Sequence, residues 1–166
     1  MNDVLYEHIV ARKSGPLDLI KKISLISSMI ILLFVSYAIF HSFGVLFTII
    51  IGFLMYTFVF TRIDKEYEYT LLNRDMDIDV IYSRQKRKKI LSFDFQKAEI
   101  IAPRNSPRLN SINIEKTYDF SSNDPNEKAF AIIINIDRKR TCVIIEPDQG
   151  MINHIRPWMG SRFYLD

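Results

Sequence analysis

The chain has 166 residues, a formal net charge of +3 and one cysteine, which excludes an intramolecular disulfide and a strongly basic nucleic-acid-binding protein. The 41 charged side chains all lie outside residues 23–61. This uncharged run of 39 residues is longer than the about 20 apolar residues of one transmembrane helix. The composition therefore indicates a membrane protein rather than an ordinary soluble domain.

Residues 1–22 form a mostly polar N-terminal segment that we expect to be cytoplasmic. Side chains that would share one face of a helix occur at Val4, Leu5, His8, Ile9 and Arg12. This spacing predicts a short amphipathic helix on the membrane or against the rest of the protein, with a partly ordered tail as the alternative. No A-x-A-like cleavage site follows the apolar run, so we expect the run to be kept as an anchor.

The uncharged run predicts two transmembrane helices, at about 23–40 and 45–61, joined by a turn at His41–Gly44. Lys and Arg flank only the outer ends, at Arg12, Lys13, Lys21, Lys22, Arg62 and Lys65. This distribution predicts a multi-pass protein of the cell membrane with both termini cytoplasmic. Because the spans hold no ionisable residue except His41, a pump or channel acting alone is disfavoured.

Residues 62–166 are predicted to form a cytoplasmic, mainly-β domain. Seven short segments rich in aromatic and branched residues read as strands, at 66–72, 76–83, 88–93, 97–102, 116–120, 129–136 and 140–146. The loop from Pro103 to Asn113 is long enough to be functional or mobile. A helical apolar face follows at Met151, Ile152, Ile155, Trp158 and Met159. We expect this C-terminal helix to close one end of a small antiparallel barrel.

The strand pattern in YEYTLLNRDMDIDVIY and KKILSFDFQKAEIIAP, followed by a helix after IIEPD, resembles a bacterial pleckstrin-homology-like (PH-like) domain from Glu66 to Gly160. The whole chain is similar to an uncharacterised family of small two-span membrane proteins from Gram-positive bacteria. This resemblance implies a seven-stranded antiparallel barrel closed by a C-terminal helix, a role in binding or assembly, and no catalytic residues. The first turn, Asn73–Asp75, has one cation where a lipid-binding pattern would have a basic loop.

A basic cluster, RQKRKK, lies between the second and third predicted strands. The linker before the first strand reaches at most roughly 18 Å, so the returning second strand should bring this cluster to the level of the headgroups. Each cation near an anionic leaflet contributes about 1 kcal/mol, enough to orient the domain. The candidate contacts with anionic headgroups or a protein partner are Arg84, Lys86, Arg87, Lys88, Lys89, Arg138, Lys139 and Arg140. The alternative is a solvated turn that limits association between sheet edges.

Sequence motifs for catalysis or cofactors are absent. The chain has no C-x-x-C, no H-E-x-x-H and no glycine-rich phosphate loop, so we expect no enzymatic activity, cofactor or metal. Asp75, Asp77 and Asp79 share one face of a strand; we interpret them as a solvated face balanced by nearby cations, with a divalent-cation site as the alternative. Cys142 is predicted to be a buried structural residue.

Two functions fit these observations. The first is a non-catalytic, membrane-anchored binding or scaffolding protein that presents a PH-like domain at the cytoplasmic surface. The second is an accessory subunit of a larger transporter or cell-envelope complex, contacted through the transmembrane helices. The lipid bilayer and an unidentified protein are the predicted partners, nucleic acid is not, and homo-oligomerisation is left open.

Overall fold

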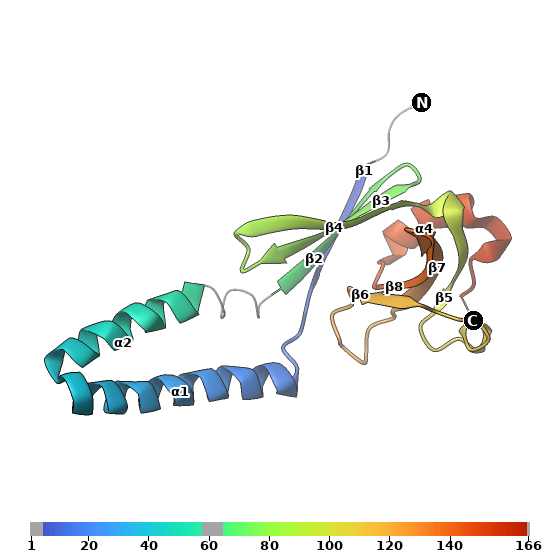
Figure 1. Ribbon diagram of the computed structural model, residues 1–166. Coiled ribbons are helices and arrows are strands. Elements are labelled where there is room, and N and C mark those ends of the chain that lie inside the picture. The colour runs from blue at the N-terminus through green and yellow to red at the C-terminus, as the bar shows by residue number, and fades with distance from the viewer. Residues whose placement is uncertain (1–4, 58–64, 166) are drawn as a thin grey trace. The chain divides into compact units, whose positions relative to one another are not determined.

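The computed structural model describes residues 5–57 and 65–165, which divide into two compact units (Figure 1). Residues 14–57, together with Lys65 and residues 82–85, form a helical unit. Residues 5–13, 66–81 and 86–165 form a β unit. The N-terminal residues 5–13, which the sequence analysis treated as a separate segment, lie in the β unit.

The helical unit contains α1 (Pro16–Phe40) and α2 (Ser42–Met55), which reverse direction at His41. The charge-free part of α1, residues 23–40, is about 27 Å long at 1.5 Å per residue. Of the described residues, only α1 forms a helix long and apolar enough to cross a membrane, and it fits either a span or an N-terminal signal. The predicted second span extends to residue 61, and its end lies outside the described residues.

The two helices pack through a small polar seam. The Oγ of Ser36 lies 2.7 Å from the Oγ1 of Thr48, which donates to the carbonyl of Gly44 at 2.9 Å. A Cβ at Gly44 would lie 2.1 Å from the carbonyl oxygen of Ser36. Gly44 therefore allows the close backbone approach that the turn requires. We call α1 and α2 together the helical hairpin.

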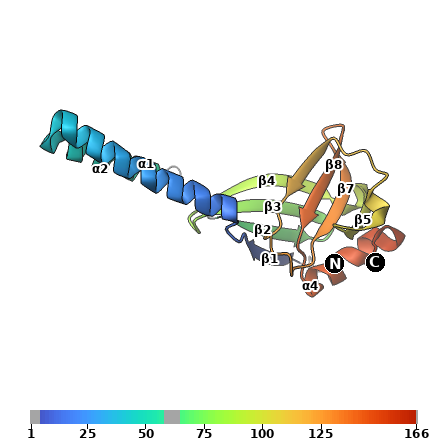
Figure 2. The same cartoon turned by 90° about the horizontal axis from the view of Figure 1, so that it is seen from below.

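The first sheet of the β unit contains β1 (Leu5–Ala11), β2 (Lys65–Leu72), β3 (Asp75–Tyr82) and β4 (Lys86–Asp94) in that spatial order (Figure 2). The prediction of an N-terminal amphipathic helix was wrong, because this segment is strand β1. It pairs antiparallel with β2, from Leu5 opposite Leu72 to Ala11 opposite Glu66. Tyr6, His8 and Val10 are less exposed than their neighbours, so burial follows the two-residue period of a strand.

The second sheet contains β5 (Ala98–Pro103), β6 (Lys116–Asp119), β7 (Phe130–Ile136) and β8 (Lys139–Ile145), in the order β5-β7-β8-β6. Strand β6 runs parallel to β8. The predicted seven-stranded antiparallel barrel is therefore corrected: the described residues form eight strands in two four-stranded sheets that do not close into a barrel. The parallel pair and the additional N-terminal strand account for the difference.

The C-terminal helix α4 (Gln149–Met159) is present as predicted, and Met151, Ile152, Ile155 and Met159 are buried on one face. Trp158 is only half-buried. Asp148 caps the helix by accepting a hydrogen bond from the Met151 amide. Short 3-10 helices complete the unit at Phe95–Lys97 (η2), Pro107–Leu109 (η3) and Gly160–Arg162 (η4).

The long loop after β5 covers one face of the second sheet. Leu109, Ile112 and Ile114 pack against a buried cluster formed by Ala131, Ile133, Cys142 and Ile144. Because β7 and β8 are buried on both faces, their near-continuous apolar sequences need such a cover. The loop length predicted a functional or mobile segment, whereas these contacts give the loop a structural role.

Candidate functional site

We call residues 83–89 the basic turn; they comprise the turn between β3 and β4 at residues 83–85 and the first four residues of β4. The basic turn lies at the end of the first sheet that connects to the helical hairpin. Ala11 at the end of β1 faces Glu66 near the start of β2. The Lys65 ammonium lies 5.8 Å from the ring centroid of Tyr82, at the end of β3. Both connections to the helices and the basic turn therefore occur at the same end of this sheet.

Two of the predicted contact residues in this turn are committed to ion pairs. Arg87 bridges Glu68 of β2, which is only 3% exposed, and its Nε lies 3.8 Å from Asp79 of β3. The Nζ of Lys89 lies 2.6 Å from the carboxylate of Asp77. These cations balance an acidic sheet face, so Arg87 and Lys89 are less available to an external anion than the sequence indicated.

Two of the three aspartates on β3, Asp77 and Asp79, lie beside cations of the neighbouring strand β4. Burial acts to raise the pKa of Asp77, but hydrogen bonds from Lys89 and Ser92 hold that pKa below 3.8. Met76, Ile78 and Val80 on the opposite face are buried. Within residues 5–57 and 65–165, no group of three or more His, Cys, Asp or Glu is arranged to hold a metal ion.

Lys86 and Lys88 are exposed, and neither has an ion-pair partner in the described part of the chain. Arg84 is also exposed and has a positive φ of 57°, next to Ser83 with a φ of 46°. Consecutive positive φ angles are typical of tight turns between antiparallel strands. Lys86 and Lys88 are therefore the outward cations of the basic turn.

The second basic turn, residues 137–140, joins β7 to β8. Arg140 is held by Glu99 of β5 through two contacts, with its Nε and Nη2 at 3.2 and 3.1 Å from the two carboxylate oxygens. Its backbone amide also donates to Glu115. Arg138 and Lys139 stay exposed, so Arg140 is a structural residue within the second sheet.

A cleft in the β unit was not anticipated from the sequence. Its volume is about 780 Å³, and it lies beside β1, which forms the edge of the first sheet. We call it the edge cleft. The residues of β1 and its C-terminal extension that line it are His8, Ile9, Val10, Ala11 and Lys13; the other walls come from residues 122–130, 146–149, Ile152 and Leu165.

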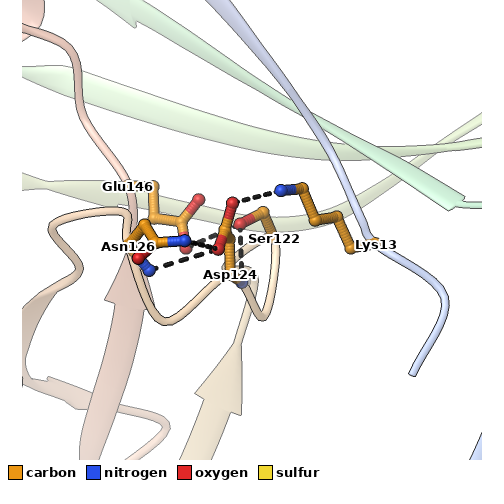
Figure 3. Close-up of polar contacts among 5 residues, drawn as sticks. All are labelled: Lys13, Ser122, Asp124, Asn126 and Glu146. Carbon is orange, nitrogen blue, oxygen red and sulfur yellow. Dashed lines mark hydrogen bonds and ion pairs between the residues drawn. The ribbon is translucent and has the colours of Figure 1, made fainter. Parts of the chain in front are cut away.

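A chain of polar contacts joins five residues that line the edge cleft (Figure 3). Lys13 forms an ion pair with Asp124, and its backbone amide donates to the Ser122 carbonyl at 2.8 Å. The Ser122 hydroxyl donates to Glu146 at 3.1 Å and accepts from the Asp124 amide at 3.0 Å. Asn126 donates to Asp124 from its backbone and side chain. These contacts fix the loop after β6 against the chain that follows β1.

Two carboxylates at the rim of the cleft, those of Asp124 and Asp148, have lowered pKa values. The hydrogen bond from Lys13 is the main cause that lowers the pKa of Asp124, with further contributions from Asn126. Partial burial acts to raise the pKa of Asp148, but hydrogen bonds from Tyr6 and the Met151 amide and the nearby His8 hold it below 3.8. Both carboxylates are therefore charged near neutral pH.

Cys142 lies in β8 and is 5% exposed. Burial raises the pKa of its thiol, and the neighbouring Asp119 carboxylate adds to the increase. A buried thiol with a raised pKa is a poor nucleophile. This confirms the interpretation of Cys142 as a packed side chain.

No curated protein and no solved structure matches the chain. Residues 2–165 match the family model described as "Bacterial PH-like domain (DUF6106)", so the chain belongs to that family.

Proposed function

We propose that the chain is a non-catalytic, membrane-anchored binding or scaffolding protein. In this proposal the helical hairpin crosses the cell membrane twice, and the PH-like β unit is presented on the cytoplasmic side. The outward cations of the basic turn, Lys86 and Lys88, face the anionic headgroups and orient the β unit.

One observation carries this proposal: the helical hairpin is inserted between two paired neighbouring strands. Strand β1 leads into α1 after only four residues, 12–15, and β2 follows the helices. A four-residue connection reaches at most about 14 Å. An anchored hairpin would therefore hold the β unit at two points, which restricts rotation more than one linker does.

The apolar surface of the helical hairpin supports its placement in a membrane. Large apolar side chains are exposed along both helices, including Phe34, Phe43, Phe47, Ile49 and Phe53. Exposed apolar side chains that continue along two helices are rare on soluble proteins. The polar Ser36 and Thr48 are instead buried between the helices, which is where polar groups belong in a membrane hairpin.

Cysteine labelling in cells tests the topology. In a Cys142→Ala background, His41→Cys and Gln85→Cys are treated with a membrane-impermeant maleimide, first in intact cells and then in inside-out vesicles. Two crossings predict that position 41 reacts only from outside and position 85 only from inside. Labelling of both positions from the same side would contradict the double crossing and favour a single span or a signal sequence.

Photocrosslinking separates the binding role from that of an accessory subunit. A photoreactive amino acid replaces either Lys128 or Arg138 in the β unit, or Ile30 or Ile49 on the exposed helix surface. The binding role predicts protein adducts at the first two positions. Adducts confined to the helices would instead identify an accessory subunit contacted through its spans.

A further inference from the structure

Strand β1 has an unprotected edge. It is the first strand of the sheet order, and in the described part of the chain only β2 pairs with it. In an antiparallel pair, alternate residues direct their N–H and C=O groups away from the partner. Edge strands are commonly protected by Lys, Pro or a bulge. The sequence of β1, LYEHIVA, has no Lys or Pro, and its register with β2 is continuous.

This edge borders a cleft rather than a flat surface. Residues 8–11 of β1 line the edge cleft together with residues from the loop after β6 and from the start of α4. A volume of about 780 Å³ is in the range of well-formed binding sites. The cleft thus places hydrogen-bonding backbone groups beside a space large enough for several residues of another chain.

The charges that line the cleft favour a cationic ligand. Four carboxylates line it, from Asp124, Glu127, Glu146 and Asp148, against the ammonium groups of Lys13 and Lys128. Lys13 is already paired with Asp124. Glu146 is 7% exposed, and its Oε1 accepts a hydrogen bond from the Ser122 hydroxyl. Lys13 interacts with Glu146 through space, but no described residue lies within ion-pair distance of its carboxylate. A buried carboxylate with a neutral partner is stabilised when a cation joins it.

We propose that the edge cleft binds an extended peptide segment of a partner protein. The segment adds a strand to the free edge of β1 and places a Lys or Arg side chain against Glu146. Backbone pairing supplies affinity in this mode, and side-chain pockets supply specificity. The net acidic lining disfavours an anionic headgroup as the occupant. This proposal rests on the proposed binding role and names the class of partner.

The test uses the full chain in nanodiscs of phosphatidylcholine, panned against a random dodecapeptide phage library. Selected peptides are expected to combine β-branched residues with Lys or Arg. Glu146→Gln, which keeps an acceptor for Ser122, should weaken their binding at least about tenfold. Glu127→Gln removes the same charge from an exposed lining position and should weaken binding no more than about threefold.

Hydrogen exchange gives an independent readout on the unsubstituted protein. Peptide addition should protect alternate backbone amides of residues 6–12, which binding by charge alone would leave unchanged. The proposal fails if no peptide binds above background, if selected peptides bind Glu146→Gln equally well, or if β1 gains no protection. Labelling at positions 41 and 85 is measured without peptide, so failure here is distinct from failure of the membrane topology.

Discussion

The hydroxyl of Tyr6 donates a 2.5 Å hydrogen bond to the carboxylate of Asp148, which lies 142 residues later in the chain. The same carboxylate caps α4 through the Met151 amide. A Cβ at Gly150 would lie 2.2 Å from the Tyr6 hydroxyl oxygen, so glycine permits this close approach. One side chain therefore fixes both the first strand and the last helix of the β unit.

This contact predicts a pH-dependent stability. The pKa of Asp148 is held below its usual value, so its contribution is present above about pH 4 and is lost as pH falls through the folded-state pKa. Tyr6→Phe should lower the thermal midpoint of the full chain in detergent at pH 7, and its difference from the unsubstituted protein should narrow below pH 4. A difference that is constant from pH 7 to pH 3 would contradict this assignment.

The seam of the helical hairpin predicts a steric effect. Gly44→Leu places a side chain against the Ser36 backbone, and such overpacking costs about 1–3 kcal/mol. The end of the Met29 side chain lies beside Gly52 across the helices, so a short bifunctional thiol reagent should crosslink Met29→Cys with Gly52→Cys in membranes, in a Cys142→Ala background. Gly44→Leu should reduce the crosslinking yield, whereas Gly15→Ala, with no atom within 4 Å of its added Cβ, should not. Equal crosslinking yields in Gly44→Leu and Gly15→Ala would contradict the close packing of the two helices at Gly44.

The two arginine ion pairs should differ in their effect on stability. Arg87→Gln leaves the carboxylate of Glu68, which is 3% exposed, without its cation, and an unpaired buried charge costs about 3 kcal/mol. Arg140→Gln removes a half-exposed pair with Glu99, worth about 0.5 kcal/mol. Chemical denaturation of the full chain in detergent measures both free energies of unfolding. If the two variants lose the same free energy of unfolding, the Glu68 carboxylate is hydrated in solution.

The outward cations of the basic turn predict a dependence on lipid charge. Lys86→Gln with Lys88→Gln removes two cations, each worth about 1 kcal/mol near an anionic surface. In a Cys142→Ala background, Gln85→Cys should react more slowly with a water-soluble maleimide in phosphatidylglycerol nanodiscs than in phosphatidylcholine nanodiscs. The double substitution should abolish this difference.

The matched control for the lipid experiment removes the same charge from the second basic turn. Arg138 and Lys139 are exposed like Lys86 and Lys88, so Arg138→Gln with Lys139→Gln should preserve the lipid dependence at position 85. If the unsubstituted protein shows no dependence on lipid charge, the basic turn does not contact headgroups.

Local patterns in the sequence predicted the elements whose burial follows a clear period. The alternation of Met76, Ile78 and Val80 identified β3, and the apolar face of Met151, Ile152, Ile155 and Met159 identified α4. The uncharged residues of α1 were identified by length and composition. In each case the information is contained within one short segment of the chain.

Other features depend on residues that are distant in sequence. Seven residues of β1 fit a helical spacing as well as a strand, and only pairing with β2 beyond the helical hairpin decides between them. Likewise, the sequence of the basic cluster did not predict the ion pair between Arg87 and Glu68 of β2. The edge cleft requires four separate segments to meet. The alternation of Tyr6, His8 and Val10 was the one available signal for β1.

The insertion of the helical hairpin between β1 and β2 also determines the order in which the molecule can be assembled. A ribosome completes β1 first, then both helices, and only afterwards the strand with which β1 pairs. The pairing of β1 with β2 therefore cannot form until both helices and β2 have been synthesised. Folding of the β unit therefore depends on synthesis of both helices before its first strand can find its partner.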